Sequence, residues 1–587
     1  MRWLLAFAAL LASAVAATAQ DRRLPYEVVL TGVENADLRT LLMATSHLES
    51  LKDNPPFTVA GLQRRMDDDR PRLDEALRSQ GYYDARIEMS VETAQEPAVV
   101  RIAIETGPVY RLAAYEVRYV AGDAGDLPRE PAALGLTVGA PAHAADIVAA
   151  EDTLFRELAN RGHPFAQRRD RRVVVDHNTR TMRATVEVDA GPDVRLAAPQ
   201  FDGAAGVETS YLQRLVPWRA GDRFDRRRLD ELATRLRASG LFESVTIEPA
   251  GAAGPDGRVP VTVRLREGPP RSFGGGLAYS TSEGIAATAF WEHRNLLDRQ
   301  EKLRFELEAG QLVQRLTGTF IAPNVGRYGQ DVRASQVIEN QDTEAFEGVL
   351  ATTQAGVERT FGPRLKASAG GLLEYSSITD EEGERQFALL GLPLAVTWDG
   401  RDDILDPTRG IRVRAETTPF FGVLFEDALF LRNEVTASTY WAPFSDRTVV
   451  LAGRARIGSI AGDATEDIPA NRRFYSGGGG SLRGFAYQLA GPLDRDGDPL
   501  GGRSVVEVGA EARFRVFGDF GIVPFFEGGN VYDSTLPEFG GRYLWSAGLG
   551  LRYFTPLGPV RLDVAVPLNP RDEDDSFQFY ISLGQAF

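Results

Sequence analysis

The sequence predicts small α+β domains followed by a transmembrane antiparallel β-barrel of about 16 strands. Three observations lead to this fold class. In the first half, a glycine before bulky residues and a later Gly-Pro pair recur together three times. Short segments in which apolar and polar residues alternate fill the second half. The end of the chain, residues 576–587, alternates in the same way and closes on the aromatic residue Phe587. Recurrence at a nearly fixed spacing predicts repeated domains, and alternation with period two predicts strands.

The chain begins with a segment typical of an export signal. Arg2 precedes an apolar run, and Ala17-Thr18-Ala19 is a small-x-small cleavage site, so residues 1–19 are predicted to be a signal peptide. The sequence contains no cysteine, which excludes disulfides and thiolate metal sites. A formal net charge of −16 argues against nucleic acid as a partner.

A repeated pair of landmarks organises the first half. Gly81, Gly162 and Gly240 each end a helix-like stretch and precede bulky residues. Gly-Pro pairs follow each of them at a similar distance and would break a strand. The pattern predicts a β-α-α-β-β order in each repeat. The predicted domains are residues 20–108, 109–192 and 193–269, and the barrel is residues 270–587.

Alternation in the second half fits a barrel better than a soluble sandwich. In residues 506–516, Val508, Ala510 and Phe514 share one face, while Glu511 and Arg513 share the other. A sandwich would also alternate, but a polar lumen requires paired charges of both signs, and the polar faces here carry both Arg and Glu. Aromatic girdles at the membrane interfaces are expected from Trp291, Trp398, Trp441 and Trp545.

Several motifs in this half resemble one family. A glycine run, Gly477–Gly480, leads to Arg483-Gly484-Phe485, which resembles the sixth extracellular loop of proteins that combine POTRA domains with a barrel. The strand motif around Glu527, the hairpin at 553–565 and the turn at 398–410 also resemble that family. The resemblance implies that the loop enters the lumen, where Arg483 pairs with Glu511, Glu527 or both. A guanidinium suits this role because it binds carboxylates bidentately.

The number of repeats points to one branch of the family. Three POTRA domains with this barrel resemble TamA, which implies an outer-membrane insertase that assembles or translocates autotransporters and other barrel proteins. The implied partners are a TamB-like periplasmic and inner-membrane protein, unfolded outer-membrane clients and outer-membrane lipid, with one barrel per complex. The alternatives are a two-partner-secretion pore for a dedicated exported protein and a BamA-like general assembly subunit. The implied location is the outer membrane, with the N-terminal domains in the periplasm.

The two ends of the barrel predict a weak seam. The first strand, near residues 272–280, contains Gly274, Gly275 and Gly276, and the closing strand contains Gly584 before Phe587. Glycine offers no side chain to pack and weakens a strand. We therefore expect few ladder bonds across this seam, lateral opening, and a C-terminus that curls inward.

No constellation in the sequence predicts catalysis. The five histidines are scattered without metal-ligand spacing, and the run at Asp494-Arg495-Asp496-Gly497-Asp498 lacks the closing Glu of a calcium loop. We therefore expect no enzyme activity, no metal and no cofactor.

Overall fold

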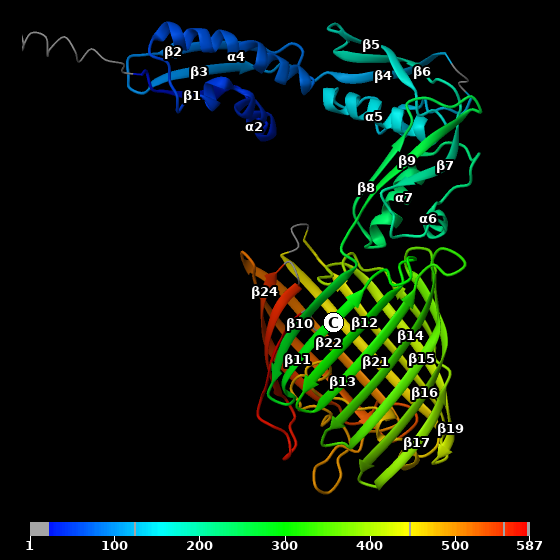
Figure 1. Cartoon of the computed structure of the whole chain (residues 1–587). Helices are drawn as coiled ribbons and strands as arrows, with labels where there is room; N and C mark the ends of the chain where they lie inside the picture. The colour runs from blue at the N-terminus through cyan, green and yellow to red at the C-terminus, as the bar shows by residue number, and fades with distance from the viewer. Residues whose placement is uncertain (1–22, 122–124, 445–447, 556–557, 584–587) are drawn as a thin grey trace, which may run out of the picture. The chain divides into compact units, whose positions relative to one another are not determined.

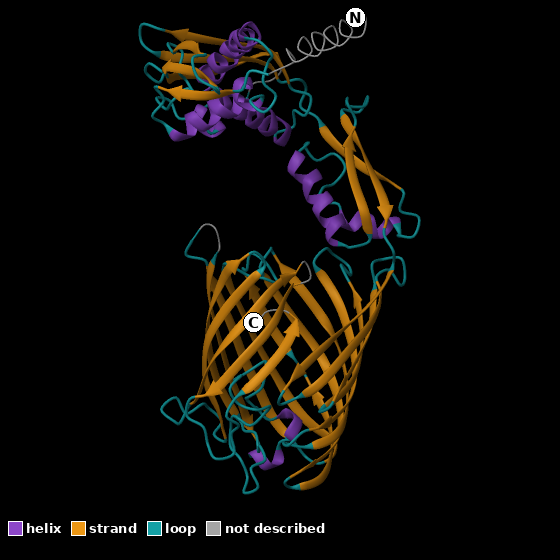
Figure 2. Ribbon diagram, turned by 90° about the vertical axis from the view of Figure 1, so that its left-hand side faces the viewer, coloured by secondary structure: helices purple, strands orange, loops and turns teal. Residues whose placement is uncertain are grey.

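The computed structural model describes residues 23–121, 125–444, 448–555 and 558–583. The predicted signal peptide, Gly584 and Phe587 lie outside these residues. The described chain contains three three-stranded sheets and one closed barrel, shown in Figures 1 and 2. Within the same residues, none of the helices is long and apolar enough to cross a bilayer.

The first domain packs helices on one mixed sheet. Its elements are β1 (Tyr26–Thr31), α2 (Ala36–Thr45), α3 (His47–Ser50), α4 (Val59–Ser79), β2 (Arg86–Glu92) and β3 (Ala98–Glu105). The central strand β3 runs parallel to β1 and antiparallel to β2. Thr58 caps α4 by accepting a hydrogen bond from the Gly61 amide, and Leu62, Leu73 and Leu77 form its buried stripe.

The second domain departs from the predicted order. Its elements are β4 (Arg111–Ala121), η1 (Pro131–Leu134), α5 (Ala144–Asn160), β5 (Gln167–Asp176) and β6 (Thr181–Asp189). A short 3₁₀ turn therefore replaces the first of the two expected helices. Pro131 begins this turn and Gly135 ends it in the left-handed region, so the segment is too short for an α-helix. The sheet order, β4-β6-β5, matches that of the first domain.

The third domain has the predicted β-α-α-β-β order. Its elements are β7 (Arg195–Asp202), α6 (Thr209–Leu215), α7 (Arg226–Ala238), β8 (Phe242–Pro249) and β9 (Arg258–Glu267), with sheet order β7-β9-β8. In all three domains the landmark glycine that follows the last helix has a positive φ, namely 86° at Gly81, 91° at Gly162 and 68° at Gly240. Glycine is favoured there because a left-handed residue ends the helix and turns the chain into the next strand.

The remaining strands form the barrel. They are β10 (Arg271–Ser280), β11 (Gly284–His293), β12 (Lys302–Gly310), β13 (Val313–Ala322), β14 (Gln330–Asp342), β15 (Glu347–Phe361), β16 (Leu365–Asp380), β17 (Gly383–Gly391), β18 (Leu394–Asp399), β19 (Gly410–Phe425), β20 (Leu429–Trp441), β21 (Val449–Gly462), β22 (Ser504–Phe517), β23 (Phe520–Tyr532), β24 (Leu544–Thr555), β25 (Gly558–Pro567) and β26 (Gln578–Leu583).

Two of these segments are parts of one strand. β17 and β18 both pair with β16 on one side and with β19 on the other, and Pro393 lies between them. Proline interrupts the ladder because it has no N–H to donate. The described residues therefore close a barrel of 16 strands, and the predicted fold class is confirmed.

Burial shows which face of each strand looks outward. On β22, Val508, Phe514 and Val516 are exposed, while Glu511 and Arg513 are buried. Elsewhere on the barrel the tryptophans Trp291, Trp398 and Trp441 are also exposed. A soluble sandwich would bury its apolar faces, so this inverted pattern indicates a barrel with a lipid-facing exterior and a polar lumen.

Parts of the third domain belong to the same compact unit as the barrel. Tyr211 on α6 donates a hydrogen bond to Gln300 and accepts one from Asn324 at 3.3 Å, and both partners lie in barrel turns. Gln300 in turn donates to the Ser239 carbonyl at 2.8 Å. The Arg299 guanidinium lies 2.7 Å from the Glu208 carboxylate. These contacts join residues 201–216 and 234–246 of the domain to the barrel end at which β10 begins.

Candidate functional site

The segment between β21 and β22 folds into the barrel. Phe474, Leu482 and Phe485 are all nearly inaccessible although they lie in a long connection. Its two arms are joined by reciprocal backbone hydrogen bonds between Phe474 and Gly502, at 2.8 and 3.0 Å. We call residues 463–503 the lumen loop. Burial of its apolar side chains inside the barrel explains how an irregular segment can stay ordered there.

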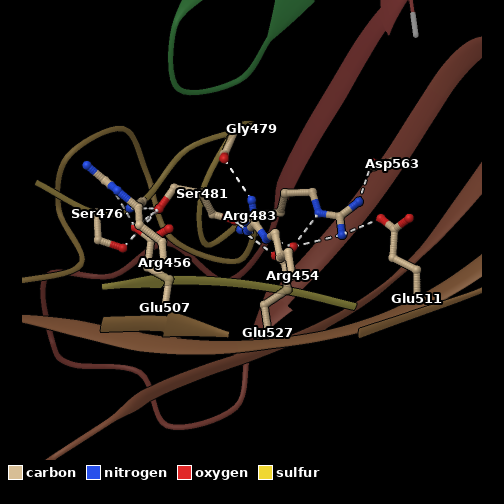
Figure 3. A network of polar contacts seen from close by, with 12 residues as sticks. Arg454, Arg456, Ser476, Gly479, Ser481, Arg483, Glu507, Glu511, Glu527 and Asp563 are labelled. Atoms are coloured by element: carbon tan, nitrogen blue, oxygen red, sulfur yellow. Dashed lines mark hydrogen bonds and ion pairs between the residues drawn. The ribbon is translucent and has the colours of Figure 1, made fainter. Parts of the chain in front are cut away.

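Arg483, in the middle of this loop, is the centre of a polar network (Figure 3). Its Nη2 donates to Glu511 Oε1 and to Glu527 Oε1, both at 2.8 Å, and its Nη1 donates to Asp563 Oδ2 at 2.8 Å. The Arg483 backbone amide also donates to Glu527 Oε2 at 2.9 Å. The guanidinium stacks over Phe525, 3.5 Å from the ring centroid. One loop residue thus contacts strands β22, β23 and β25.

More arginines neutralise the same carboxylates. Arg513 pairs with Glu511 at 3.1 Å and Arg454 pairs with Glu527 at 3.0 Å. Asp563 is bonded by Arg552 and lies 3.3 Å from Arg561. Buried charges are costly unless they are paired and hydrogen-bonded, and each carboxylate here has at least two cationic partners. Removal of Arg483 would take one cationic partner from all three carboxylates at once.

The expected pairing of Arg483 was with Glu511, Glu527 or both, and in the structure Arg483 contacts both carboxylates. Position 484 has no room for a side chain, because a Cβ there would lie 2.4 Å from Cβ of Ser546. Phe485 is buried with Leu482, Ala490 and Leu544. Sequence reasoning missed Asp563 as a partner. Its signal was available, since Asp563 is an acidic residue between the apolar Leu562 and Val564 of an alternating strand.

A second anchor of the lumen loop was not predicted. Arg472 Nε donates to Glu374 Oε1 at 3.0 Å, and Asn471 Nδ2 donates to the same oxygen at 2.9 Å. The next residue, Arg473, donates to Asp380 Oδ2 at 3.2 Å. Both acidic residues lie on β16 and are buried. The loop is therefore held to two separate parts of the barrel wall, because β16 is not a neighbour of β22–β25 in the barrel.

The seam between the first and last strands is sparsely paired in the described residues. β26 pairs with β25 at six positions but with β10 only at Tyr279↔Ile581 and Ser280↔Tyr580. The glycines Gly274–Gly276, expected at the seam from the sequence, have no described partner on the β26 side. Antiparallel pairing that joins Ser280 to Tyr580 places Tyr580 and Ile581 at the far end of β10 from those glycines. The predicted inward curl of the C-terminus lies outside the described residues.

The described residues contain no group of three or more His, Asp or Glu side chains placed to hold a metal ion. Asp494 uses its side chain to accept the amides of Asp496 and Asp498 at 2.8 Å, as acidic residues in turns do.

Comparison with known proteins adds to this geometry. The Omp85 superfamily domain matches residues 268–587, and a POTRA model described as a surface antigen variable number repeat matches residues 194–268. The chain is 24% identical over 541 residues to the outer membrane protein assembly factor BamA of Nitratidesulfovibrio vulgaris, covering 86% of this chain but 66% of that protein, just under two thirds. It is 21% identical over 596 residues to BamA of Neisseria meningitidis serogroup B, covering 89% of this chain and 73% of that protein.

A solved structure shares the fold. The crystal structure of BamA from Haemophilus ducreyi lacking POTRA domains 1–3 superposes with a TM-score of 0.67 at 17% identity, and covers 81% of this chain and 100% of that one. Since the superfamily match spans more than half of the chain, and the structure supplies the closed barrel and the α+β repeats that the match implies, this chain belongs to the Omp85 superfamily and is an outer-membrane β-barrel with periplasmic POTRA domains.

Proposed function

We propose that this protein is an assembly factor that inserts other β-barrel proteins into the outer membrane through the seam between β10 and β26. The observation that carries the proposal is the sparse pairing of these strands, which meet at two positions among the described residues. The names of the two BamA relatives, as outer membrane protein assembly factors, point the same way.

The physical basis of insertion is strand pairing. A strand edge presents unpaired N–H and C=O groups, and an extended client segment satisfies them by adding as a new strand. Most of β10, from Arg271 to Ala278, has no described partner on the β26 side. In this proposal the driving force is the client's own burial in lipid and its own hydrogen bonding, so no nucleotide is required.

Within this function we propose the TamA-like role. Three periplasmic domains precede the barrel, and the resemblance of this arrangement to TamA supports a TamB-like periplasmic and inner-membrane partner. Autotransporters are then expected among the clients. We place the partner at the first domain, residues 24–108, whose sheet leaves strand edges free to pair within the described residues. The protein has no catalytic role in this proposal.

A covalent lock of the seam tests the insertion mechanism. The chain has no cysteine, so the pair Tyr279→Cys and Ile581→Cys introduces the only two thiols, at directly paired positions. The matched control is Val564→Cys with Phe579→Cys, which joins β25 to β26 at another direct pair. Oxidation of the first pair is expected to stop insertion of a barrel client into liposomes and reduction to restore it. Oxidation of the control pair is expected to leave insertion unchanged.

Full insertion by the oxidised seam variant would contradict lateral insertion. Transport of one dedicated exported protein through a locked barrel would favour the two-partner-secretion alternative. Co-purification from native membranes separates the two assembly roles: a TamB-like partner that is lost when residues 24–108 are deleted supports the TamA-like role. Partner binding that survives this deletion would contradict the placement of the partner, and general loss of all outer-membrane barrels on depletion would favour the BamA-like role.

A further inference from the structure

The glycine run of the lumen loop lies against both sides of the seam. A Cβ on Gly478 would lie 3.0 Å from Oε1 of Glu283, which stands in the turn between β10 and β11. A Cβ on Gly479 would lie 2.8 Å from the ring of Tyr580 on β26. These two neighbouring loop residues therefore contact the first hairpin and the closing strand at once. We call Gly478 and Gly479 the loop tip.

Other bonds hold the loop tip in this place. The Gly479 carbonyl accepts a hydrogen bond from Arg561 Nη2 on β25 at 3.3 Å, drawn in Figure 3. The descending part of the loop is bonded to the hairpin that leads into β26. There, Arg571 donates to the carbonyls of Leu489 at 2.6 Å and Gly491 at 2.8 Å. The same guanidinium pairs with Asp574 at 2.8 Å.

Among the described residues, Thr281 makes further bonds across the seam. Thr281, in the turn after β10, donates its amide to the Phe579 carbonyl at 3.0 Å and its hydroxyl to the Gln578 side chain at 2.5 Å. The Phe579 amide also donates to the Thr281 hydroxyl at 3.1 Å. Because the described residues pair β10 with β26 at two positions, the contacts of the loop tip add to a small set of bonds between the two edges.

We propose that the loop tip is a clasp: it holds the β10–β11 hairpin against β26, and the seam opens when the tip withdraws. The idea rests on the proposed lateral opening and adds the element that controls it. The anchor at Arg483 then acquires a second role, since it fixes the loop a few residues beyond the tip and so keeps the tip over the seam. A client or ligand that displaces the loop would open the seam without touching either strand.

Two adjacent glycines offer a matched test. Gly479 has no positive φ, so Gly479→Ala adds only a methyl group, directed at Tyr580. Gly480 also lacks a positive φ and has nothing within 4 Å of its Cβ position, so Gly480→Ala is the control. Gly478 is unsuitable because its φ of 93° would add backbone strain to any substitution.

The measurement is amide hydrogen–deuterium exchange of the purified full-length protein without client. In Gly479→Ala, residues 278–283 and 578–583 are expected to exchange about tenfold faster, the ratio that corresponds to roughly 1.4 kcal/mol of lost local closure. Exchange in β15 and β16 is expected to stay unchanged, as is all exchange in Gly480→Ala. Glu283→Ala removes the other contact and is expected to accelerate the same two segments, which keeps the test available should Gly479→Ala fail to fold.

Unchanged seam exchange in both Gly479→Ala and Glu283→Ala would overturn the clasp, and so would equal acceleration in Gly480→Ala. The outcome is separable from that of the seam lock. Hydrogen–deuterium exchange reports how firmly the seam is closed in the protein without client. The disulfide pair reports insertion of a client. Either proposal can therefore fail while the other stands.

Discussion

Two parts of the barrel differ sharply in what joins their strands. β23 and β24 pair over ten consecutive residues, and the wall around them is tied from inside by Arg483 and its carboxylates. β10 and β26 pair at two described positions, and β10 contains three consecutive glycines, Gly274–Gly276. The backbone chemistry is identical in both places, so the difference arises from register and from side chains.

The comparison indicates that one part of the barrel is rigid and the other can open. Charges that cross-link three strands make the wall one rigid body, because buried ion pairs lose much when any partner leaves. The seam has no comparable network among the described residues, and its strands separate at a lower cost. A barrel that must open at one place and stay whole elsewhere needs this contrast.

The largest effect is expected from removal of the central cation. Arg483→Ala removes the buried hydrogen bonds that Arg483 makes with Glu511, Glu527 and Asp563, although each carboxylate keeps another arginine partner. The loss of a hydrogen bond to a charged group typically costs about 1.5–3 kcal/mol. The urea midpoint of barrel unfolding in detergent should fall strongly, while the transition of the N-terminal domains stays in place. The control is Arg412→Ala, another lumen arginine, which lies 3.9 Å from Asp399 and is partly exposed.

Equal midpoints for Arg483→Ala and Arg412→Ala would contradict the rigid-wall interpretation. The variant Arg483→Lys tests whether the charge alone of Arg483 stabilises the wall. A lysine supplies the charge but not the planar fork that contacts three carboxylates, so its midpoint should lie between those of the alanine variant and the native protein.

A smaller effect is expected from a methyl group placed inside the wall. A Cβ on Gly550 would lie 2.3 Å from Oδ1 of Asp563 and 2.4 Å from Nη1 of Arg552, within the ion-pair network. Gly550→Ala should therefore destabilise the barrel by about 1–3 kcal/mol, as overpacking does. Gly371→Ala on β16 is the matched control, since nothing lies within 4 Å of its Cβ position.

Denaturant titration of both glycine variants measures the difference in their free energies of unfolding. A loss in Gly371→Ala as large as that in Gly550→Ala would mean that alanine in any barrel strand is harmful. The network around Asp563 would then have no special rigidity.

The smallest effect is expected at a periplasmic turn that belongs to neither part. Asp402, between β18 and β19, accepts hydrogen bonds from the Thr408 hydroxyl at 2.6 Å and from the Thr408 and Arg409 amides at 2.9 and 3.0 Å. Burial alone would raise the pKa of Asp402, but these hydrogen bonds outweigh it and lower the pKa from 3.8 to about 2. Stability from this group is thus complete above pH 3.8 and is lost as the pH falls through about 2.

Thermal unfolding of the native protein and of Asp402→Asn measures this contribution. The difference between their midpoints should be constant near neutral pH and should shrink as the pH falls from about 4 toward 2. Amide hydrogen–deuterium exchange of residues 278–283 and 578–583 should be the same in both proteins. A midpoint difference that persists below pH 2 would show that Asp402 does not act through its charge.

Local patterns in the sequence determined the fold class and much of the candidate site. The landmark glycines marked the helix ends of all three domains, because a left-handed residue is needed wherever a helix turns directly into a strand. Alternation on β22 separated the lipid face from the lumen face, because successive side chains of a strand point in opposite directions. The resemblance of the glycine run and Arg483-Gly484-Phe485 to a loop of the family implied that this segment enters the lumen, and its apolar side chains are buried in the structure.

Only the tertiary structure decided which residues meet. Alternation assigns a side chain to a face, but it does not set the register between strands that are far apart in the chain. For this reason Asp563, Glu374 and Asp380 were not recognised as partners of the lumen loop, and the described seam pairs, Tyr279 with Ile581 and Ser280 with Tyr580, were not predicted individually. Closure of the barrel fixes how far each strand is shifted along its neighbour, and this shift is a property of all the strands together.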